Sequence, residues 1–135
     1  MKSKALGLIV AVAFLLVTGC NFNSPARIYG SFYKALQDKN GEIAWQYIDK
    51  GSQQDFNNTA FFFNQMGDAQ VNSAKQAWIL VVNQHGARGL PEPEELAETV
   101  IEGNEAQLHF SNHRIIHLKK ENGEWKILAT ATSDN

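Results

Sequence analysis

The histidines are the first residues in this sequence whose spacing suggests chemistry. His109, His113 and His117 recur every four residues, and on a helix they would share one face and could bind a metal ion. The residues around them alternate between apolar and polar, which predicts a strand, and four residues of a strand separate side chains by roughly 13 Å. Zinc ligands lie about 2 Å from the ion, and cross-strand pairing would bring only two of these histidines together. We therefore predict no metal site and expect the histidines on the polar face of a half-exposed sheet.

A carboxylate beside an imidazole is the second candidate. Gly103-Asn104 predicts a two-residue hairpin turn, and that turn places Glu98 across from His109. Such a pair could orient the imidazole for acid–base catalysis. The apolar residues of the hairpin occupy its other face, however, so we expect an exposed pair that contributes little. The sequence also contains no Cys–His or Ser–His–Asp arrangement, no glycine-rich phosphate loop and no paired cysteines. We therefore predict no catalytic residue and no cofactor.

The single cysteine, Cys20, is the residue with the clearest predicted role. Two lysines near the start precede the 13 apolar or small residues 5–17, which is typical of a secretory signal and too short for a membrane span of about 20 residues. Val17-Thr18-Gly19-Cys20 then resembles the bacterial lipobox, an aliphatic residue and two small ones before a cysteine. The alternative is an incidental cysteine after an ordinary secretory signal, but polar sequence begins directly at Asn21.

The resemblance to the lipobox implies a domain organisation and a cellular location. Residues 1–19 would be a lipoprotein signal peptide that is removed, and the acyl chains attached to Cys20 would anchor the mature chain to a membrane. Residues 20–24 would form a lipid-anchored tether, and residues 25–135 one domain. Because Asn21 rather than an aspartate follows the cysteine, the resemblance implies the bacterial cell envelope, on the periplasmic face of the outer membrane where the host has one.

The charge balance argues against nucleic acid as a partner. Of the 12 Lys and Arg residues, Lys2 and Lys4 lie in the predicted signal peptide, so 10 remain against 14 Asp and Glu. This mildly acidic chain has no run of basic residues. With Cys20 acylated, the 116 residues that remain have no disulfide, so a single domain must be stabilised by its own hydrophobic core.

The rest of the sequence predicts helices first. Ser24-Pro25 predicts the start of a helix that ends at Asn40-Gly41, and a short second helix follows. Ser52 is the expected cap of a third helix. A fourth helical segment covers residues 68–86, and the prolines of residues 87–93 predict a loop.

Strands follow, in two predicted antiparallel hairpins. The turn at Gly103-Asn104 defines the pairs of the first hairpin: Ile101–Ala106, Thr99–Leu108 and Ala97–Phe110. Asn122-Gly123 suits a type I′ turn and defines the pairs of the second: Lys120–Trp125, Leu118–Ile127 and Ile116–Ala129. Both registers collect mostly apolar residues on one face, so we expect Trp125 on the buried face of the last strand.

The connection between the hairpins has two alternatives. A two-residue turn at Asn112-His113 would place Phe110 opposite Ile115, and a slightly longer connection would place it opposite Ile116. We favour the longer connection because it keeps a single apolar face.

Helices followed by antiparallel strands predict an α+β fold with helices on one face of a sheet. The segments "ARIYGSFYKALQDKNGEIAWQYID" and "KKENGEWKI" are similar to the NTF2-like superfamily, and more narrowly to its small bacterial lipoproteins of unknown function. This resemblance implies a curved antiparallel sheet, formed mainly by the C-terminal half, around N-terminal helices that enclose a cone-shaped cavity.

The aromatic residues are the candidates for lining such a cavity. Phe61, Phe62 and Phe63 are consecutive in a predicted helix, so their side chains point about 100° apart and cannot all enter one core. They are either two core rings and one surface ring, or an aromatic lip on a cavity or partner surface. The residues that we expect to line the cavity combine apolar rings with, in several cases, a polar edge: Tyr29, Tyr33, Trp45, Phe61, Phe62 and Trp78.

Two classes of function follow from these observations. We expect a membrane-anchored lipoprotein whose NTF2-like domain is a non-catalytic binding or interaction module, with an envelope protein or a small apolar ligand as partner. The alternative is a small NTF2-like enzyme that acts on an apolar molecule in the cone. The first is favoured because no acid, base and nucleophile converge at suitable spacing.

Overall fold

The computed structural model describes residues 24–66 and 71–129, except for the side chains of Phe62, Phe63 and Met66. In these residues the fold is α+β, as predicted. The helices come first: α2 (Pro25–Gln37), α3 (Gly41–Trp45), α4 (Lys50–Met66) and α5 (Ala74–His85). A 3-10 turn, η1 (Pro93–Glu95), leads into the strands: β1 (Leu96–Glu102), β2 (Glu105–Phe110), β3 (Ile115–Glu121) and β4 (Glu124–Ile127). None of the helices described is long and apolar enough to cross a membrane.

Polar caps start α2 and α3. The Ser24 hydroxyl accepts a hydrogen bond from the backbone N–H of Arg27, and Pro25 occupies the first turn, as the sequence predicts. Asn40 in turn accepts from the N–H of Ile43 and starts α3. The prediction that Asn40-Gly41 ends the first helix is therefore wrong, because α2 already ends at Gln37 and the chain reverses through Lys39, whose φ is 54°.

Gly41 has a packing role that sequence alone does not indicate. A Cβ atom at this position would lie 3.0 Å from the Cα of Ile79 on α5. Real Cβ contacts are essentially never shorter than this, so the glycine allows the backbones of α3 and α5 to approach closely.

The cap of α4 differs from the prediction. The carboxylate of Asp49, the residue before α4, accepts from the backbone N–H groups of Gly51 at 3.1 Å and Ser52 at 3.3 Å. These are the second and third residues of the helix, so Asp49 is the cap and Ser52, the predicted cap, lies inside the first turn. The fourth helix begins at Ala74, capped by Ser73, which is later than the predicted segment 68–86.

The four strands form an antiparallel meander in the order β1-β2-β3-β4. The predicted pairs at both turns are confirmed for Ile101–Ala106, Thr99–Leu108, Lys120–Trp125 and Leu118–Ile127. Two outer pairs are wrong. A β-bulge between Leu96 and Glu98 places Leu96, rather than Ala97, opposite Phe110. At the other end β4 stops at Ile127, so Ala129 is not a strand residue and does not pair with Ile116 in the sheet.

The connection between the hairpins matches neither alternative. Leu108 lies opposite Ile116 and His109 opposite Ile115, and the N–H of Phe110 donates to the carbonyl of Arg114. The connection is therefore shorter than the favoured one. His113 adopts a φ of 68°, which is typical of three-residue hairpin loops. The reason for favouring the longer connection still holds, because Leu108 and Ile116 share a face.

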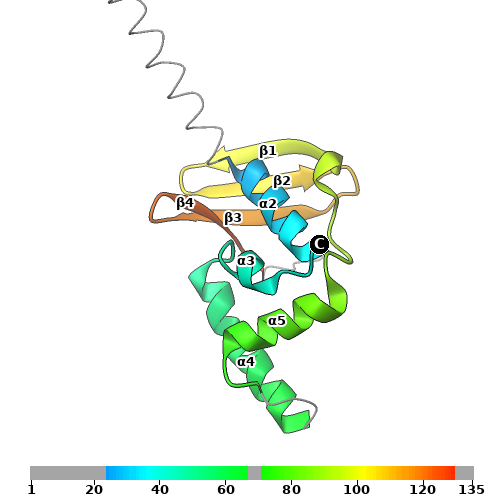
Figure 1. The fold of residues 1–135 in the computed structure, drawn as a ribbon. Helices are drawn as coiled ribbons and strands as arrows, with labels where there is room; N and C mark the ends of the chain where they lie inside the picture. The colour runs from blue at the N-terminus through cyan, green and yellow to red at the C-terminus, as the bar shows by residue number, and fades with distance from the viewer. Residues whose placement is uncertain (1–23, 67–70, 130–135) are drawn as a thin grey trace, which may run out of the picture.

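One face of the sheet is covered by helix and forms the core. Figure 1 shows α2 lying across the strands, and α2 packs against β2 and β4. Trp125 is on this face with 5% of its surface exposed, which confirms its predicted position. The core includes Tyr29, Phe32 and Leu36 from α2 and Ala106, Leu108, Phe110, Leu118, Trp125 and Ile127 from the strands.

The other helices extend away from the sheet. In Figure 1, α4 and α5 form a pair below it, and α5 also packs against α3. A short extended segment joins the two parts, because Ile48 forms a parallel bridge with Ile127. The N–H of Asp49 donates to the carbonyl of Ile127 at 3.0 Å, and the N–H of Ile127 donates to the carbonyl of Tyr47 at 2.7 Å. This pairing fixes the start of α4 relative to β4.

Candidate functional site

A cavity of about 590 Å³ lies between α2, α5 and β3. Its walls also include the loop after α5 and residues 127–129 at the end of β4. The C-terminal ends of α2 and α5 approach each other on one side of it (Figure 1), where a Cβ at Gly86 would lie 3.3 Å from the carbonyl oxygen of Leu36. Its volume is within the range of about 300–1,000 Å³ of small-molecule sites.

The floor of the cavity is apolar and buried. The side chains that form it are buried residues of the hydrophobic core, together with Ile116, which packs against that core: Tyr29, Phe32, Leu36, Trp78, Val82 and Ile127. The floor presents little polarity, because its two polar edges already have partners. The hydroxyl of Tyr29 donates to the carbonyl of Pro91, and the indole N–H of Trp78 donates to the carbonyl of Gly41 at 2.9 Å. A molecule on this floor would therefore meet mainly carbon.

Burial has an electrostatic consequence at Tyr29. It raises the pKa of this phenol well above its usual value, because the ionised form would lose its hydration. The nearby negative charge of an ionised Tyr33 would raise this pKa further, whereas the positive charge of Arg114 lowers it. The charge of Arg114 thus acts on a residue of the cavity floor.

The rim of the cavity is basic. The lining residues with basic side chains are His85, Arg88, His113, Arg114 and His117, and we call them the basic rim. In the described part of the chain, no aspartate or glutamate lines the cavity. Three of the five, His85, Arg88 and His113, are exposed, so the rim faces solvent while the floor does not.

Arg114 has a defined position on this rim. Its Nη1 donates to the carbonyl of Gly89 at 2.9 Å, which links the β2–β3 connection to the loop after α5. A guanidinium has five N–H donors, so this bond uses one of them. Across residues 24–66 and 71–129, none of the ion pairs found includes Arg88 or Arg114.

Two of the six residues expected to line the cavity lie against it, Tyr29 and Trp78. Tyr33 lines a separate hollow between α2 and Glu92, Pro93 and Glu94. Burial raises the pKa of Tyr33, and these glutamates add to the rise. Glu92 and Glu94 therefore line this hollow rather than the cavity.

Two of the remaining three, Trp45 and Phe61, lie elsewhere. Trp45 is half-buried and packs edge-on against Phe56, with ring centroids 6.2 Å apart, and it is not among the residues that line the cavity. Phe61 is 63% exposed on α4. The side chain of Phe62 lies outside the described residues, as does Cys20, the predicted lipid attachment site.

The carboxylate–imidazole pair is present in the sheet but is not arranged for catalysis. Glu98 and His109 are cross-strand partners, as predicted. The Nε2 of His109 lies 2.9 Å from the amide oxygen of Gln107, and Glu98 is exposed on the solvent side of the sheet. Within the described residues, no group of three or more His, Cys, Asp or Glu side chains is arranged to hold a metal ion.

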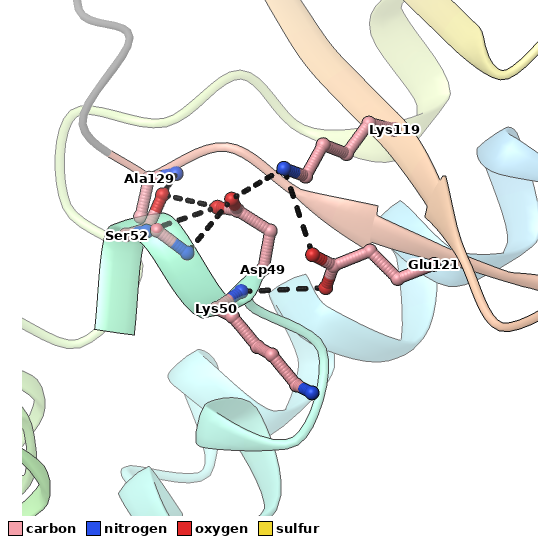
Figure 2. Close-up of polar contacts among 7 residues, drawn as sticks. Asp49, Lys50, Ser52, Lys119, Glu121 and Ala129 are labelled. Carbon is pink, nitrogen blue, oxygen red and sulfur yellow. Dashed lines mark hydrogen bonds and ion pairs between the residues drawn. The ribbon is translucent and has the colours of Figure 1, made fainter. Parts of the chain in front are cut away.

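A second polar cluster lies where α4 meets the sheet. Figure 2 shows the carboxylate of Asp49, which accepts a hydrogen bond from the Ser52 hydroxyl. The Nζ of Lys119, on β3, lies 3.5 Å from one oxygen of this carboxylate. The Ser52 oxygen also accepts from the N–H of Ala129 at 3.0 Å, and Lys119 approaches Glu121 at 3.6 Å. These groups satisfy one another and contain no imidazole or thiol, so we interpret the cluster as a structural link between α4 and the strands.

The basic rim is the feature that the sequence analysis missed. Its residues come from the end of α5, the loop after it, the β2–β3 connection and β3, and only the fold brings them together. Residues 85–88 contain two basic side chains and residues 113–117 contain three, but that signal is too weak to identify a site.

Comparison with known proteins adds no assignment, because no protein family, curated protein or solved structure matches this chain.

Proposed function

We propose that this chain is a bacterial envelope lipoprotein whose NTF2-like domain, anchored through lipid on Cys20, is a non-catalytic module that binds a small apolar ligand. The observation that carries the proposal is the cavity of about 590 Å³ with a buried apolar floor. Filled cores have few voids larger than a water molecule, so a hollow of this size bordered by Phe32, Trp78 and Ile127 favours a ligand site over a packing gap.

The lining of the cavity supports binding rather than catalysis. General acid–base chemistry needs a proton donor or acceptor within hydrogen-bond reach of the reacting atom. Among the described residues that line the cavity, the phenol of Tyr29 is held by Pro91, no carboxylate is present, and the imidazoles belong to the rim rather than to the apolar floor. No observation favours the enzyme, which therefore stays the second candidate.

The ligand site has a direct test by cavity filling. Val81 is half-buried and lines the cavity, so Val81→Trp should fill part of it and abolish binding of a neutral probe such as dodecanol. Val100 is half-buried on β1 and does not line the cavity, so Val100→Trp is the matched control and should bind like the unmodified protein. Titration calorimetry of the full chain in phosphatidylcholine nanodiscs, with empty nanodiscs as baseline, measures both. Failure of the unmodified chain to bind would refute the ligand site.

The anchor is tested separately. Mass spectrometry of the protein isolated from bacterial membranes should find residues 1–19 absent and acyl chains on Cys20. A Cys20→Ala variant should keep residues 1–19 and should no longer be found in the lipid-modified fraction. A mature protein that begins at another residue would contradict the anchor and leave the cavity proposal standing.

A further inference from the structure

The charge of the rim identifies the chemical class of the ligand. We infer, resting on the proposed binding function, that the cavity takes a single-chain anionic amphiphile of the fatty-carboxylate class. Its hydrocarbon chain lies on the apolar floor and its carboxylate lies at the basic rim, beside Arg88 and Arg114.

The first argument is the separation of charge. Without residues 1–19 the chain has 14 acidic residues against 10 Lys and Arg residues, so a random sample of its surface would contain more carboxylates than lysines and arginines. Among the described residues that line the cavity, however, two arginines occur without one carboxylate, and three histidines accompany them. Glu92 and Glu94 line the separate hollow beside Tyr33. This distribution favours a negatively charged ligand.

The second argument is the state of the arginines. The lysines that form ion pairs within the described residues, Lys34, Lys75, Lys119 and Lys126, do not line the cavity. Arg114, by contrast, is held at the rim by the carbonyl of Gly89, which leaves further guanidinium donors for a ligand. Arginine suits a carboxylate because two of its N–H groups can donate in parallel.

The third argument is the polarity of the floor. The polar atoms of Tyr29 and Trp78 are occupied by backbone carbonyls, so a polar ligand would lose hydration there without gaining hydrogen bonds. A hydrocarbon chain has no hydrogen bonds to water to lose, and its burial lowers the free energy of binding. The floor of the site therefore favours an apolar group and the rim favours a negatively charged group. A volume of about 590 Å³ suits one chain better than a two-chain phospholipid.

The test compares dodecanoate with dodecanol, which has the same chain and no charge. Each is titrated by calorimetry into the full chain in phosphatidylcholine nanodiscs at mildly alkaline pH, with empty nanodiscs as baseline. A charge-assisted hydrogen bond should make dodecanoate bind on the order of tenfold more tightly. Added salt should weaken the binding of dodecanoate and leave that of dodecanol unchanged.

Variants locate the carboxylate. Arg88 is exposed, so Arg88→Gln removes a charge without disturbing the core and should weaken dodecanoate about two- to fivefold. Arg88→Gln combined with Arg114→Gln should remove the preference over dodecanol. Lys75→Gln makes the same charge change at the other end of α5, where Lys75 pairs with Glu42, and should have no effect.

The outcomes separate this inference from the proposed function. Equal affinities for dodecanol and dodecanoate would overturn the inference and leave an apolar ligand site. Binding of neither would overturn both. A preference for dodecanoate that survives in the double arginine variant would place the carboxylate elsewhere and overturn the inference. Nanodiscs that contain phosphatidylglycerol distinguish the source of the anion. An affinity for dodecanoate that is unchanged in these nanodiscs supports a single-chain ligand. A decrease in this affinity that matches competition by phosphatidylglycerol overturns the inference in favour of a phospholipid.

Discussion

Replacing Asp49 by alanine should destabilise the domain by roughly 3 kcal/mol. Asp49 has 1% of its surface exposed and accepts hydrogen bonds from the N–H of Gly51, the N–H of Ser52 and the hydroxyl of Ser52. It caps α4 and pairs with Lys119 on β3, and the Ser52 hydroxyl that it accepts is also bonded by the N–H of Ala129, just after β4 (Figure 2).

The magnitude follows from these contacts. Loss of an aspartate cap costs about 0.5–2 kcal/mol, and a buried donor left without a partner costs about 1–3 kcal/mol, so about 3 kcal/mol is a central value. The ion pair adds little, because the Lys119 side chain is 41% exposed and its Nζ lies 3.5 Å from the carboxylate, and such pairs contribute about 0–1 kcal/mol. Domains of this size have a free energy of unfolding of about 5–15 kcal/mol, so a loss of about 3 kcal/mol is a large share of the total stability.

Urea denaturation followed by tryptophan fluorescence measures this change. Asp49→Ala should lower the free energy of unfolding by roughly 3 kcal/mol and the melting temperature by about 10 °C. Asp55, an exposed residue on α4, provides the matched control, and Asp55→Ala should change stability by less than about 0.5 kcal/mol. Lys119→Met should cost less than about 1 kcal/mol.

Two results would refute this reasoning. A loss below about 1 kcal/mol for Asp49→Ala would mean that the cap does not stabilise α4. A loss for Lys119→Met as large as that for Asp49→Ala would mean that the ion pair, rather than the hydrogen-bonded cap, stabilises the junction.

Three further predictions concern stability. Trp125→Ala should cost about 3–5 kcal/mol, because its ring is buried, and a melting temperature within a few degrees of wild type would contradict this. Stability should fall above pH 10, by up to about 1.4 kcal/mol per pH unit, because the unfolded state ionises its tyrosine while burial keeps Tyr29 protonated; urea titrations of Tyr29→Phe should lack this contribution. His113→Gly should raise stability by up to about 1 kcal/mol, because His113 has a φ of 68° that glycine adopts without strain, whereas His113→Val should lower it.

Several elements follow from the sequence because their determinants are local. Ser24-Pro25 starts α2, and the two glycine turns define the central pairs of both hairpins. A cap bonds within three residues, and a two-residue turn sets its register through its own backbone. Neither depends on distant parts of the chain.

The departures from the prediction have tertiary causes. Asp49 and Ser52 are both good caps, and the choice of Asp49 follows from the pairing of residues 47–49 with Ile127, which starts the helix at Lys50. The bulge after Leu96 and the three-residue loop at His113 likewise shift a register that the sequence pattern alone leaves open.

The candidate site is the part that the sequence determines least. Aromatic character indicated Tyr29 and Trp78, which line the cavity, but equally Trp45 and Phe61, which do not, because an apolar ring suits a core, a cavity and a surface alike. The sequence by itself determined the α+β class and the two hairpins, because these depend on neighbouring residues, and the lipid anchor at Cys20 stays a prediction from it. Only the tertiary structure placed basic side chains from separate segments around one apolar floor, because residues distant in sequence become neighbours only when the core packs.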